Sequence, residues 1–366
     1  MSDTKADRLG VVGHAAVDVL FPHLRFELTG GGVVRVAADG QWFDVRTLEP
    51  VRFCKARAAI PAGLWLHGAD RRCGGGGPNS VMGALRGAPG LNIRYLESTQ
   101  PDDLVKRTLA FPTVAMRSLD LRPTPWNAVL SAESEKLILK TELEAAPPFD
   151  EGHVDTIQWL SDCPWVLINS PKEDPIVDHL VRRALNDAVR LCLVFTGSPA
   201  PGCLWGRALP ASGAVVGSWD EIPAVMGWEP CLDLKAALQL NRRVADQARK
   251  AMVFITMGAE GVLAAAPAGG AIYHVRLQGD LWRTVQLRVQ ADPTSLAGVG
   301  DAFSGALAAY LVAGRSVVGP LAGLPLPAAA AIAGSAAALR WLGFGGLLRV
   351  SDFRCVCMDA SSAAAA

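Results

Sequence analysis

AGVGDAFSGAL, residues 297–307, places two glycines and an aspartate in front of a long apolar segment. Gly298 and Gly300 allow backbone angles and close approaches that a side chain would block. Apolar residues then recur at helical spacing, and Gly314 stands where such a helix would end. The first turn of a helix carries unpaired N–H groups and a partial positive charge, which favour phosphate. The stretch therefore predicts a buried helix with an anion site at its start.

Asp301 lies in this predicted first turn. A carboxylate there is well placed to take a proton from an attacking hydroxyl. Acidic residues also commonly cap helices, so a simple N-cap explains Asp301 equally well on spacing alone.

Short apolar runs alternate with helical segments from about residue 151 onward. The runs are PWVLIN (164–169), RLCLVF (190–195), GAVVG (213–217) and MVFIT (252–256), with helices expected at 174–188 and 234–250. This alternation, with LGVVG (9–13) as a first buried strand, predicts a parallel sheet with helices on both faces. Two hairpin signals, at 33–46 and 127–140, do not fit that sheet and predict a separate small β element.

Composition excludes several function classes. Lys plus Arg and Asp plus Glu are 35 each, so the formal net charge is zero, and neither nucleic acid nor an anionic membrane is an expected partner. None of the eight cysteines forms a C-x-x-C pair, which is typical of buried thiols in a reducing compartment. The polar start predicts no signal peptide. The uncharged segment 316–339 contains three prolines in its first half and predicts a loop and a buried helix at about 328–341, not a membrane span. A cytoplasmic location is expected.

Three further stretches are candidate ligand-binding features. GGGGPNSVMGAL (74–85) lets the backbone approach a ligand and offers Asn79 as donor and acceptor, although a loop with a helix cap explains it as well. VFITMGAEGVLAA (253–265) has a tight turn after a buried strand, where nucleotides bind in open α/β sheets, although an ordinary hairpin is the commoner reason. Asp18 follows the first strand, where an isolated acid is more often simply solvated. No stretch fits the P-loop or G-x-G-x-x-G.

The order of these features resembles the ribokinase-like carbohydrate kinase family. AGVGDAFSGAL resembles that family's T-G-A-G-D-x-F signature, GGGGPNSVMGAL its Gly-Gly…Asn segment and ITMGAEG its T-x-G-x-x-G turn. The resemblance implies one α/β domain over residues 1–366, with a doubly wound, mostly parallel central sheet flanked by helices. It also implies a small β-sheet lid built from about 22–66 and 113–142. Residues 359–366 are expected to form a disordered tail.

The resemblance also implies an activity: transfer of the γ-phosphoryl group of ATP, with Mg²⁺, to a hydroxyl of a sugar or sugar-like molecule. Asp301 would be the general base, and the anion hole would be the backbone of Gly298, Val299 and Gly300. The implied substrate-binding residues are Asp18, Gly75, Gly76 and Asn79. The implied nucleotide-binding residues are Thr256, Gly258, Gly261 and Ser335. Glu221 would serve the metal.

The sequence departs from the family pattern at several positions. Ala297 and Val299 replace the usual Thr and Ala, and backbone donors survive both changes. The family's N-x-x-E appears only as Ser218-x-x-Glu221, which keeps the carboxylate but weakens the metal site. Ser295 stands where an acid normally precedes the glycines, with Asp292 further back, which weakens the case for a monovalent-cation site.

Other functions are compatible with the same sequence. One is a catalytically weak sugar- or nucleotide-binding regulatory protein on the same fold, and a nucleoside kinase is another. A nicotinamide-dependent oxidoreductase shares the α/β alternation but would need the missing G-x-G-x-x-G. Exposed edges of a β lid also predict pairing of two copies into a homodimer.

Overall fold

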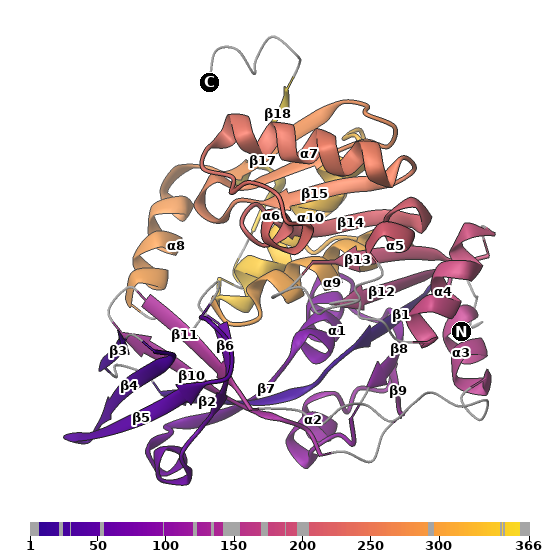
Figure 1. Cartoon of the computed structure of the whole chain (residues 1–366). Helices are drawn as coiled ribbons and strands as arrows, with labels where there is room; N and C mark the ends of the chain where they lie inside the picture. The colour runs from indigo at the N-terminus through magenta and orange to yellow at the C-terminus, as the bar shows by residue number, and fades with distance from the viewer. Residues whose placement is uncertain are drawn as a thin grey trace.

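A computed structural model of the chain forms two sheets from the residues that it describes (Figure 1). It describes residues 7–21, 25–29, 31–51, 55–97, 99–119, 123–132, 135–141, 154–169, 175–186, 188–195, 205–291, 296–344, 346 and 348–358. The expected tail at 359–366 lies outside the described residues.

The larger sheet has ten strands in the order β18-β17-β16-β15-β14-β13-β12-β1-β8-β9. They are β1 (Arg8–Gly13), β8 (Asn92–Glu97), β9 (Val114–Ser118), β12 (Trp165–Asn169), β13 (Arg190–Val194), β14 (Ser212–Ser218), β15 (Met252–Thr256), β16 (Val262–Ala265), β17 (Ile272–Leu277) and β18 (Phe353–Met358). Strands from β9 to β15 pair in parallel, whereas β16, β17 and β18 add an antiparallel edge. The predicted mostly parallel sheet is confirmed.

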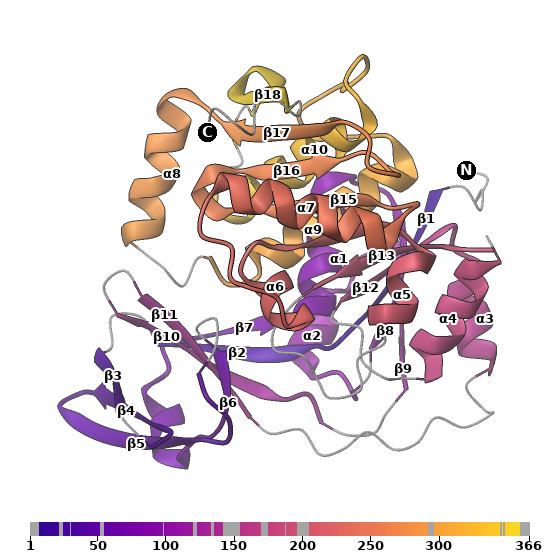
Figure 2. The same ribbon diagram turned by 45° about the horizontal axis from the view of Figure 1, so that its top comes forward.

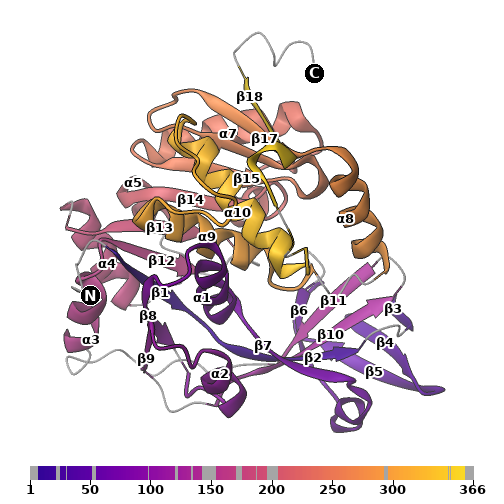
Figure 3. The same cartoon turned by 180° about the vertical axis from the view of Figure 1, so that it is seen from behind.

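Helices cover both faces of this sheet (Figures 2 and 3). One layer contains α1 (Gly76–Gly87), α9 (Val299–Ala313) and α10 (Leu326–Trp341), and the other contains α3 (Val154–Ser161), α4 (Pro175–Leu185), α5 (Trp205–Ala211) and α7 (Leu234–Ala248). The remaining helices are α2 (Asp103–Thr108), α6 (Glu221–Met226) and α8 (Gly279–Ala291). Two separate hydrophobic clusters, one under each layer, fill the space between helices and sheet. This is the doubly wound arrangement that the alternating pattern predicts.

The second sheet, called the lid sheet below, has eight strands in the order β3-β4-β5-β6-β11-β10-β2-β7. They are β2 (Ala16–Phe21), β3 (Arg25–Thr29), β4 (Val33–Ala38), β5 (Gln41–Thr47), β6 (Lys55–Ala59), β7 (Asp70–Gly74), β10 (Trp126–Ala132) and β11 (Glu135–Lys140), shown at the lower left of Figure 1. Both predicted hairpins are present, β4–β5 through Asp39 and Gly40 at positive φ, and β10–β11.

The boundaries of the lid sheet differ from those expected. It also contains β2 and β7, outside 22–66, because β2 pairs with β10 on one side and β7 on the other. By contrast β9, inside the expected 113–142, pairs with β8 and extends the central sheet. Pairing between strands that are distant in sequence decides which sheet each strand joins, and the residue pattern of a single strand does not encode that pairing.

Helices α1 and α9 cross at very short range. A Cβ added to Gly305 of α9 would lie 1.9 Å from the backbone oxygen of Ser80, and one added to Gly83 of α1 would lie 2.2 Å from that of Ala302. Glycine at these positions lets the two backbones touch. The N-terminal turn of α9 is thereby brought against the glycine-rich start of α1, and the candidate site lies there.

The uncharged segment that imitates a membrane span ends in a helix buried in the fold. Helix α10 begins at Leu326, with Pro325 as its N-cap, and most of its residues are buried against α9 and the sheet. Among the described residues, no helix combines the length and the hydrophobicity needed to cross a bilayer.

The described cysteines are free thiols. Burial raises the pKa of Cys192 to about 12, so this thiol stays protonated and behaves as a small apolar side chain. Within the described ranges, no group of three His, Cys, Asp or Glu side chains is placed to hold a metal ion.

Candidate active site

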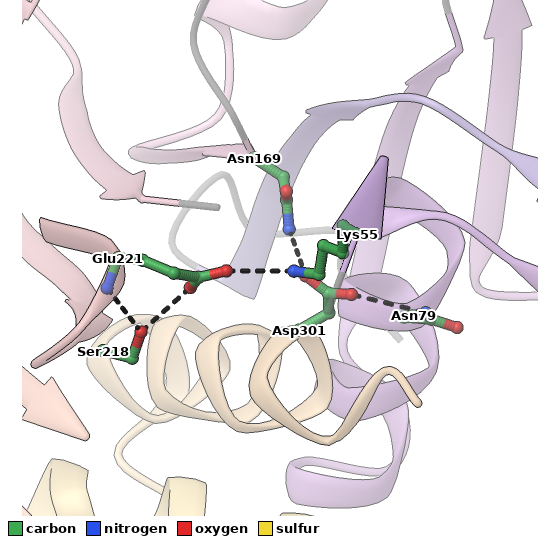
Figure 4. Close-up of polar contacts among 6 residues, drawn as sticks. All are labelled: Lys55, Asn79, Asn169, Ser218, Glu221 and Asp301. Atoms are coloured by element: carbon green, nitrogen blue, oxygen red, sulfur yellow. Dashed lines mark hydrogen bonds and ion pairs between the residues drawn. The ribbon is translucent and has the colours of Figure 1, made fainter. Parts of the chain in front are cut away.

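Asp301 lies in the first turn of α9. The helix begins at Val299 and its N-cap is Gly298, so Asp301 is not the cap. Its Oδ1 accepts a hydrogen bond from Asn169 Nδ2 at 2.9 Å, and its Oδ2 accepts a longer one from Asn79 Nδ2 at 3.4 Å (Figure 4). The capping explanation is therefore wrong. The carboxylate belongs to a polar cluster formed with two side-chain amides.

The start of α9 is held rigidly on one side and open on the other. Gly298 has φ +78°, and a Cβ there would lie 2.5 Å from Asn79 Nδ2 and 2.9 Å from the Trp341 ring. Trp341 Nε1 donates to the carbonyl of Ala297 at 2.9 Å. Gly300 is exposed, and nothing lies within 4 Å of the position of its missing Cβ. The helix tip can thus approach a ligand at Gly300.

Three backbone N–H groups precede the first hydrogen bond of α9. That bond runs from the N–H of Ala302 to the carbonyl of Gly298. The N–H groups of Val299, Gly300 and Asp301 come before it, and the opening groups of a helix have no partner within the helix. Together with the helix dipole they favour an anion at this tip.

Asn169 is a site residue that the sequence analysis missed. It is the last residue of β12, and its Nδ2 also lies 3.2 Å from Ser80 Oγ and 3.3 Å from the carbonyl of Gly76. One amide therefore links a central strand, the start of α1 and Asp301. A polar residue that ends the buried run PWVLIN was the available signal, because ligands bind at the carboxyl ends of parallel strands.

Asn79 is in the first turn of α1, not at its cap. The N-cap is Gly75, at φ +87°, and the N–H of Asn79 donates to the Gly75 carbonyl at 3.2 Å. The capping explanation for Asn79 is wrong too. Gly76 begins the helix, directly beside the Asn169 amide. The glycine-rich loop thus brings Gly75, Gly76 and Asn79 next to the Asp301 cluster.

Asp18 follows β1, as expected, and lies on β2 of the lid sheet. Its Oδ1 accepts a hydrogen bond from Asn127 Nδ2 of β10 at 2.8 Å. Burial raises the pKa of the Asp18 carboxyl, and the charge of Asp301 raises it further, against the hydrogen bond from Asn127 and the charges of Lys140 and Lys136, which lower it. Asp18 of the lid sheet is therefore near enough to Asp301 of α9 for the two charges to interact. Asn127 was not predicted from the sequence.

Glu221 connects the lid sheet to the central sheet. Its Oε1 forms an ion pair with Lys55 Nζ of β6 at 2.9 Å, and its Oε2 accepts a hydrogen bond from Ser218 Oγ at 3.1 Å (Figure 4). Ser218 Oγ in turn accepts from the N–H of Glu221 at 3.2 Å. Burial alone would lower the pKa of Lys55, but the charges of Glu221 and Asp301 outweigh it and the pKa is raised. Lys55 is a third site residue that sequence reasoning missed.

The carboxylate oxygens of Glu221 suit a magnesium ion that binds together with a nucleotide. Mg²⁺ is bound by oxygen, and at nucleotide sites it uses one or two carboxylates plus phosphates and water in place of a complete protein cage. Glu221, the first residue of α6, offers one carboxylate just after the end of β14, with Asp220 next to it in sequence. Ser218 keeps this carboxylate oriented even though the usual asparagine is absent.

The predicted nucleotide-side residues form the β15–β16 hairpin. Thr256 ends β15, and its Oγ1 donates to the Gly217 carbonyl at 3.4 Å. Gly258 begins a short 3-10 turn that ends at Gly261, whose N–H donates to the Gly258 carbonyl. The hairpin itself is present, which leaves the nucleotide role of its turn a prediction, and Thr256 pairs in register with Ser218. The hairpin therefore emerges beside the Glu221 carboxylate.

The residues expected near the adenine base and at a monovalent-cation site stay untested. Ser335 lies half-buried on α10. Its role beside a base stays a prediction. Asp292 and Ser295, which bear on a monovalent-cation site, lie outside the described residues.

Neither protein-family models nor curated proteins match the sequence, whereas solved structures match its fold. A ribokinase from Arabidopsis thaliana, complexed with ribose and ATP, is 16% identical with a TM-score of 0.58, and the match covers 98% of this chain and 97% of that one. A ribokinase from Giardia lamblia is 16% identical at TM-score 0.62, covering 93% and 95%. Phosphofructokinase-2 from Escherichia coli is 13% identical at TM-score 0.54, covering 94% and 96%.

These matches show the fold. The chain has the ribokinase-like fold of sugar kinases over nearly its whole length, as the order of its motifs predicts.

Proposed function

We propose that this protein is an ATP-dependent kinase that phosphorylates a hydroxyl of a sugar or sugar-like molecule, acting as one domain with the lid sheet over its site. The observation that carries the proposal is the position of Asp301. Its carboxylate is oriented by the Asn169 and Asn79 amides at a helix tip whose Gly300 side is open. Because helix tips favour phosphate, a base and an anion site stand side by side.

Asp301 would accept the proton of the attacking hydroxyl. The two amides hold its oxygens without neutralising the carboxylate, so it remains available as a base. The N–H groups of Val299 and Gly300, with Gly298 setting the turn, would hold the transferring phosphoryl group. Backbone dipoles fixed in advance stabilise spreading charge without reorganisation, which is most of what phosphoryl transfer demands.

The acceptor would lie between the helix tip and the lid sheet. Asp18 and Asn127 offer an acceptor and donors to sugar hydroxyls, and Gly75 and Gly76 allow close approach of the backbone. The mutual charge effect of Asp18 and Asp301 supports placing one hydroxyl at each carboxylate. Such a position also brings the reacting oxygen to the base.

The nucleotide would lie along the carboxyl ends of β14 and β15. Thr256, Gly258 and Gly261 would border it, with Ser335 further along, and Glu221 would hold Mg²⁺. Bound there, Mg²⁺ would neutralise charge on the phosphates. Lys55 is paired with Glu221 at 2.9 Å and would keep that carboxylate near the phosphates. ATP use and free thiols also suit the cytoplasm. Pairing of copies through the lid edge stays a prediction.

The test is release of ADP from ATP and Mg²⁺ by the purified protein, with a panel of sugars, sugar phosphates and nucleosides as acceptors. Asp301→Asn should lower kcat by about 10²–10⁴, the usual contribution of a positioned base, while nucleotide binding is retained. Asp280→Asn is the matched control, since Asp280 is an exposed acid in the first turn of α8. It should behave as wild type.

Other outcomes would support other functions. Equal turnover by wild type and Asp301→Asn would remove the proposed role of this carboxylate. Sugar or nucleotide binding without ADP release from any acceptor would favour a regulatory binding protein. Nucleosides as the only substrates would make the protein a nucleoside kinase.

A further inference from the structure

The face of the lid sheet that is turned toward Asp301 carries an ordered row of polar and charged residues. Strand register aligns Arg72 of β7, Asp18 of β2, Asn127 of β10, Lys140 of β11 and Arg57 of β6 directly across five neighbouring strands. Alternation along the strands puts Lys136 on the same face as Lys140. These strands lie side by side in Figures 1 and 3.

The opposite face of these strands is apolar. Val19, Phe21, Ala56, Leu130, Leu137 and Leu139 are buried there in a cluster of the lid sheet itself. On the charged face Asn127 is buried, whereas Lys140, Arg57 and Arg72 are exposed, so this face is not part of the apolar core of the lid sheet. It is the face from which Lys55 reaches Glu221 and Asp18 faces the helix tip.

Lys140 borders the hydroxyl-binding pair of the proposed site, and Lys136 lies four residues away along β11, opposite Ser131. Lys140 is directly opposite Asn127 in register, and Asn127 is directly opposite Asp18. Strands lie about 4.8 Å apart, so the backbone of Lys140 is about 10 Å from that of Asp18. The charges of both lysines act on the Asp18 carboxyl, which agrees with this placement.

We infer that the acceptor carries an anionic group, a phosphate or a carboxylate, and that Lys140 and Lys136 bind it while Asp18 and Asn127 bind its hydroxyls. This inference rests on the proposed kinase function and narrows its substrate class. The whole chain is formally neutral, and Arg57 and Arg72 of the row form ion pairs with Glu49 and Asp70, so the inference concerns the two lysines alone. An uncharged sugar has only hydroxyls to offer these ammonium groups, whereas an anion forms charge-assisted hydrogen bonds with them.

The experiment compares matched acceptors and lysine variants. Wild type, Lys140→Gln, Lys136→Gln and the double variant are assayed for ADP release with hexoses, their phosphate monoesters and the corresponding sugar acids. Lys106→Gln is the control, because Lys106 is an exposed lysine on α2. Binding of each acceptor is measured in parallel by calorimetry without ATP. Comparison of the phosphate monoesters with the sugar acids identifies which anionic group is bound.

We expect wild type to prefer a charged acceptor over its uncharged parent on the order of 10- to 100-fold in kcat/KM, with the double variant losing that preference. Lys106→Gln should retain it. A wild type that uses uncharged sugars equally well, or a preference that survives the double variant, overturns the inference.

A failure of the proposed function has a different signature. If no acceptor causes release of ADP from ATP, the calorimetric binding data alone test the inference. Tighter binding of the charged ligand that depends on the two lysines supports an anion site on a protein that is not a kinase. Equal binding of charged and uncharged ligands overturns it.

Discussion

Gly298→Ala and Gly300→Ala make a matched pair of substitutions within one turn. Gly298 has φ +78°, a conformation that costs a residue with a Cβ about 1–2 kcal/mol. The added methyl carbon would also lie 2.5 Å from Asn79 Nδ2 and 2.9 Å from Trp341. The side-chain and backbone shifts that relieve such overpacking typically lower stability by about 1–3 kcal/mol. We expect Gly298→Ala to lower the free energy of unfolding by about 2–5 kcal/mol.

The neighbours of Gly298 cannot move away freely. Trp341 is held by its hydrogen bond to the Ala297 carbonyl, and Arg86 lies over its ring at 4.5 Å. Asn79 is buried and bonded to Asp301. Any relaxation therefore displaces groups of the candidate site, and turnover should fall together with stability.

Gly300→Ala should behave in the opposite way. Gly300 is helical and exposed, with open space where a Cβ would stand, so alanine should preserve or raise stability by about 0.5 kcal/mol. If the helix tip holds the phosphoryl group, the same methyl group should still lower kcat by on the order of 10-fold or more, since a single misplaced anion-hole contact costs at least that much.

The assay is urea unfolding followed by tryptophan fluorescence and by circular dichroism, with coincident transitions as the criterion for a two-state analysis. Turnover is measured on the same preparations. A Gly298→Ala protein within about 0.5 kcal/mol of wild type would refute the packing argument, because ordinary surface substitutions change stability by that much.

Three further outcomes are expected. Gly305→Ala should destabilise the protein by about 2–4 kcal/mol in urea unfolding, because its Cβ would lie 1.9 Å from the Ser80 backbone oxygen; an unchanged midpoint would show that the helices separate at little cost. Because the pKa of Asp18 is raised from 3.8, the stability of wild type relative to Asp18→Asn should be greatest at low pH and decline as the pH rises through the raised pKa; a difference that does not vary with pH would contradict this. Lys55→Met and Glu221→Gln should show a coupling of about 1–2 kcal/mol in a double-mutant cycle, since both side chains are only 29% and 15% exposed; additive effects would mean that the ion pair contributes nothing.

Local sequence determined the elements and the two carboxylates of the site. Buried runs such as 164–169 and 252–256 are strands because apolar residues of that length exclude water on both faces, and the turn at Gly298 predicts the start of α9. The motif order then pointed to the ribokinase-like fold, which the solved structures support. Asp301 and Asp18 acquired their expected roles only from that motif order, because spacing alone explained them equally well or better as a helix cap and a solvated acid.

Tertiary structure alone decided what surrounds those carboxylates. Asn169, Asn127 and Lys55 reach the site through strand pairing and helix packing between segments more than a hundred residues apart. Only Asn169, as the polar end of a buried run, had a local signal in the sequence. Register also chose which alternate residues of β11 face the helix tip, since a slip of one residue would bury Lys140 and expose Leu139. A side chain's neighbours depend on the free energy of the whole packed fold, so periodicity can predict the helix at Asp301 but not the amides that hold its oxygens.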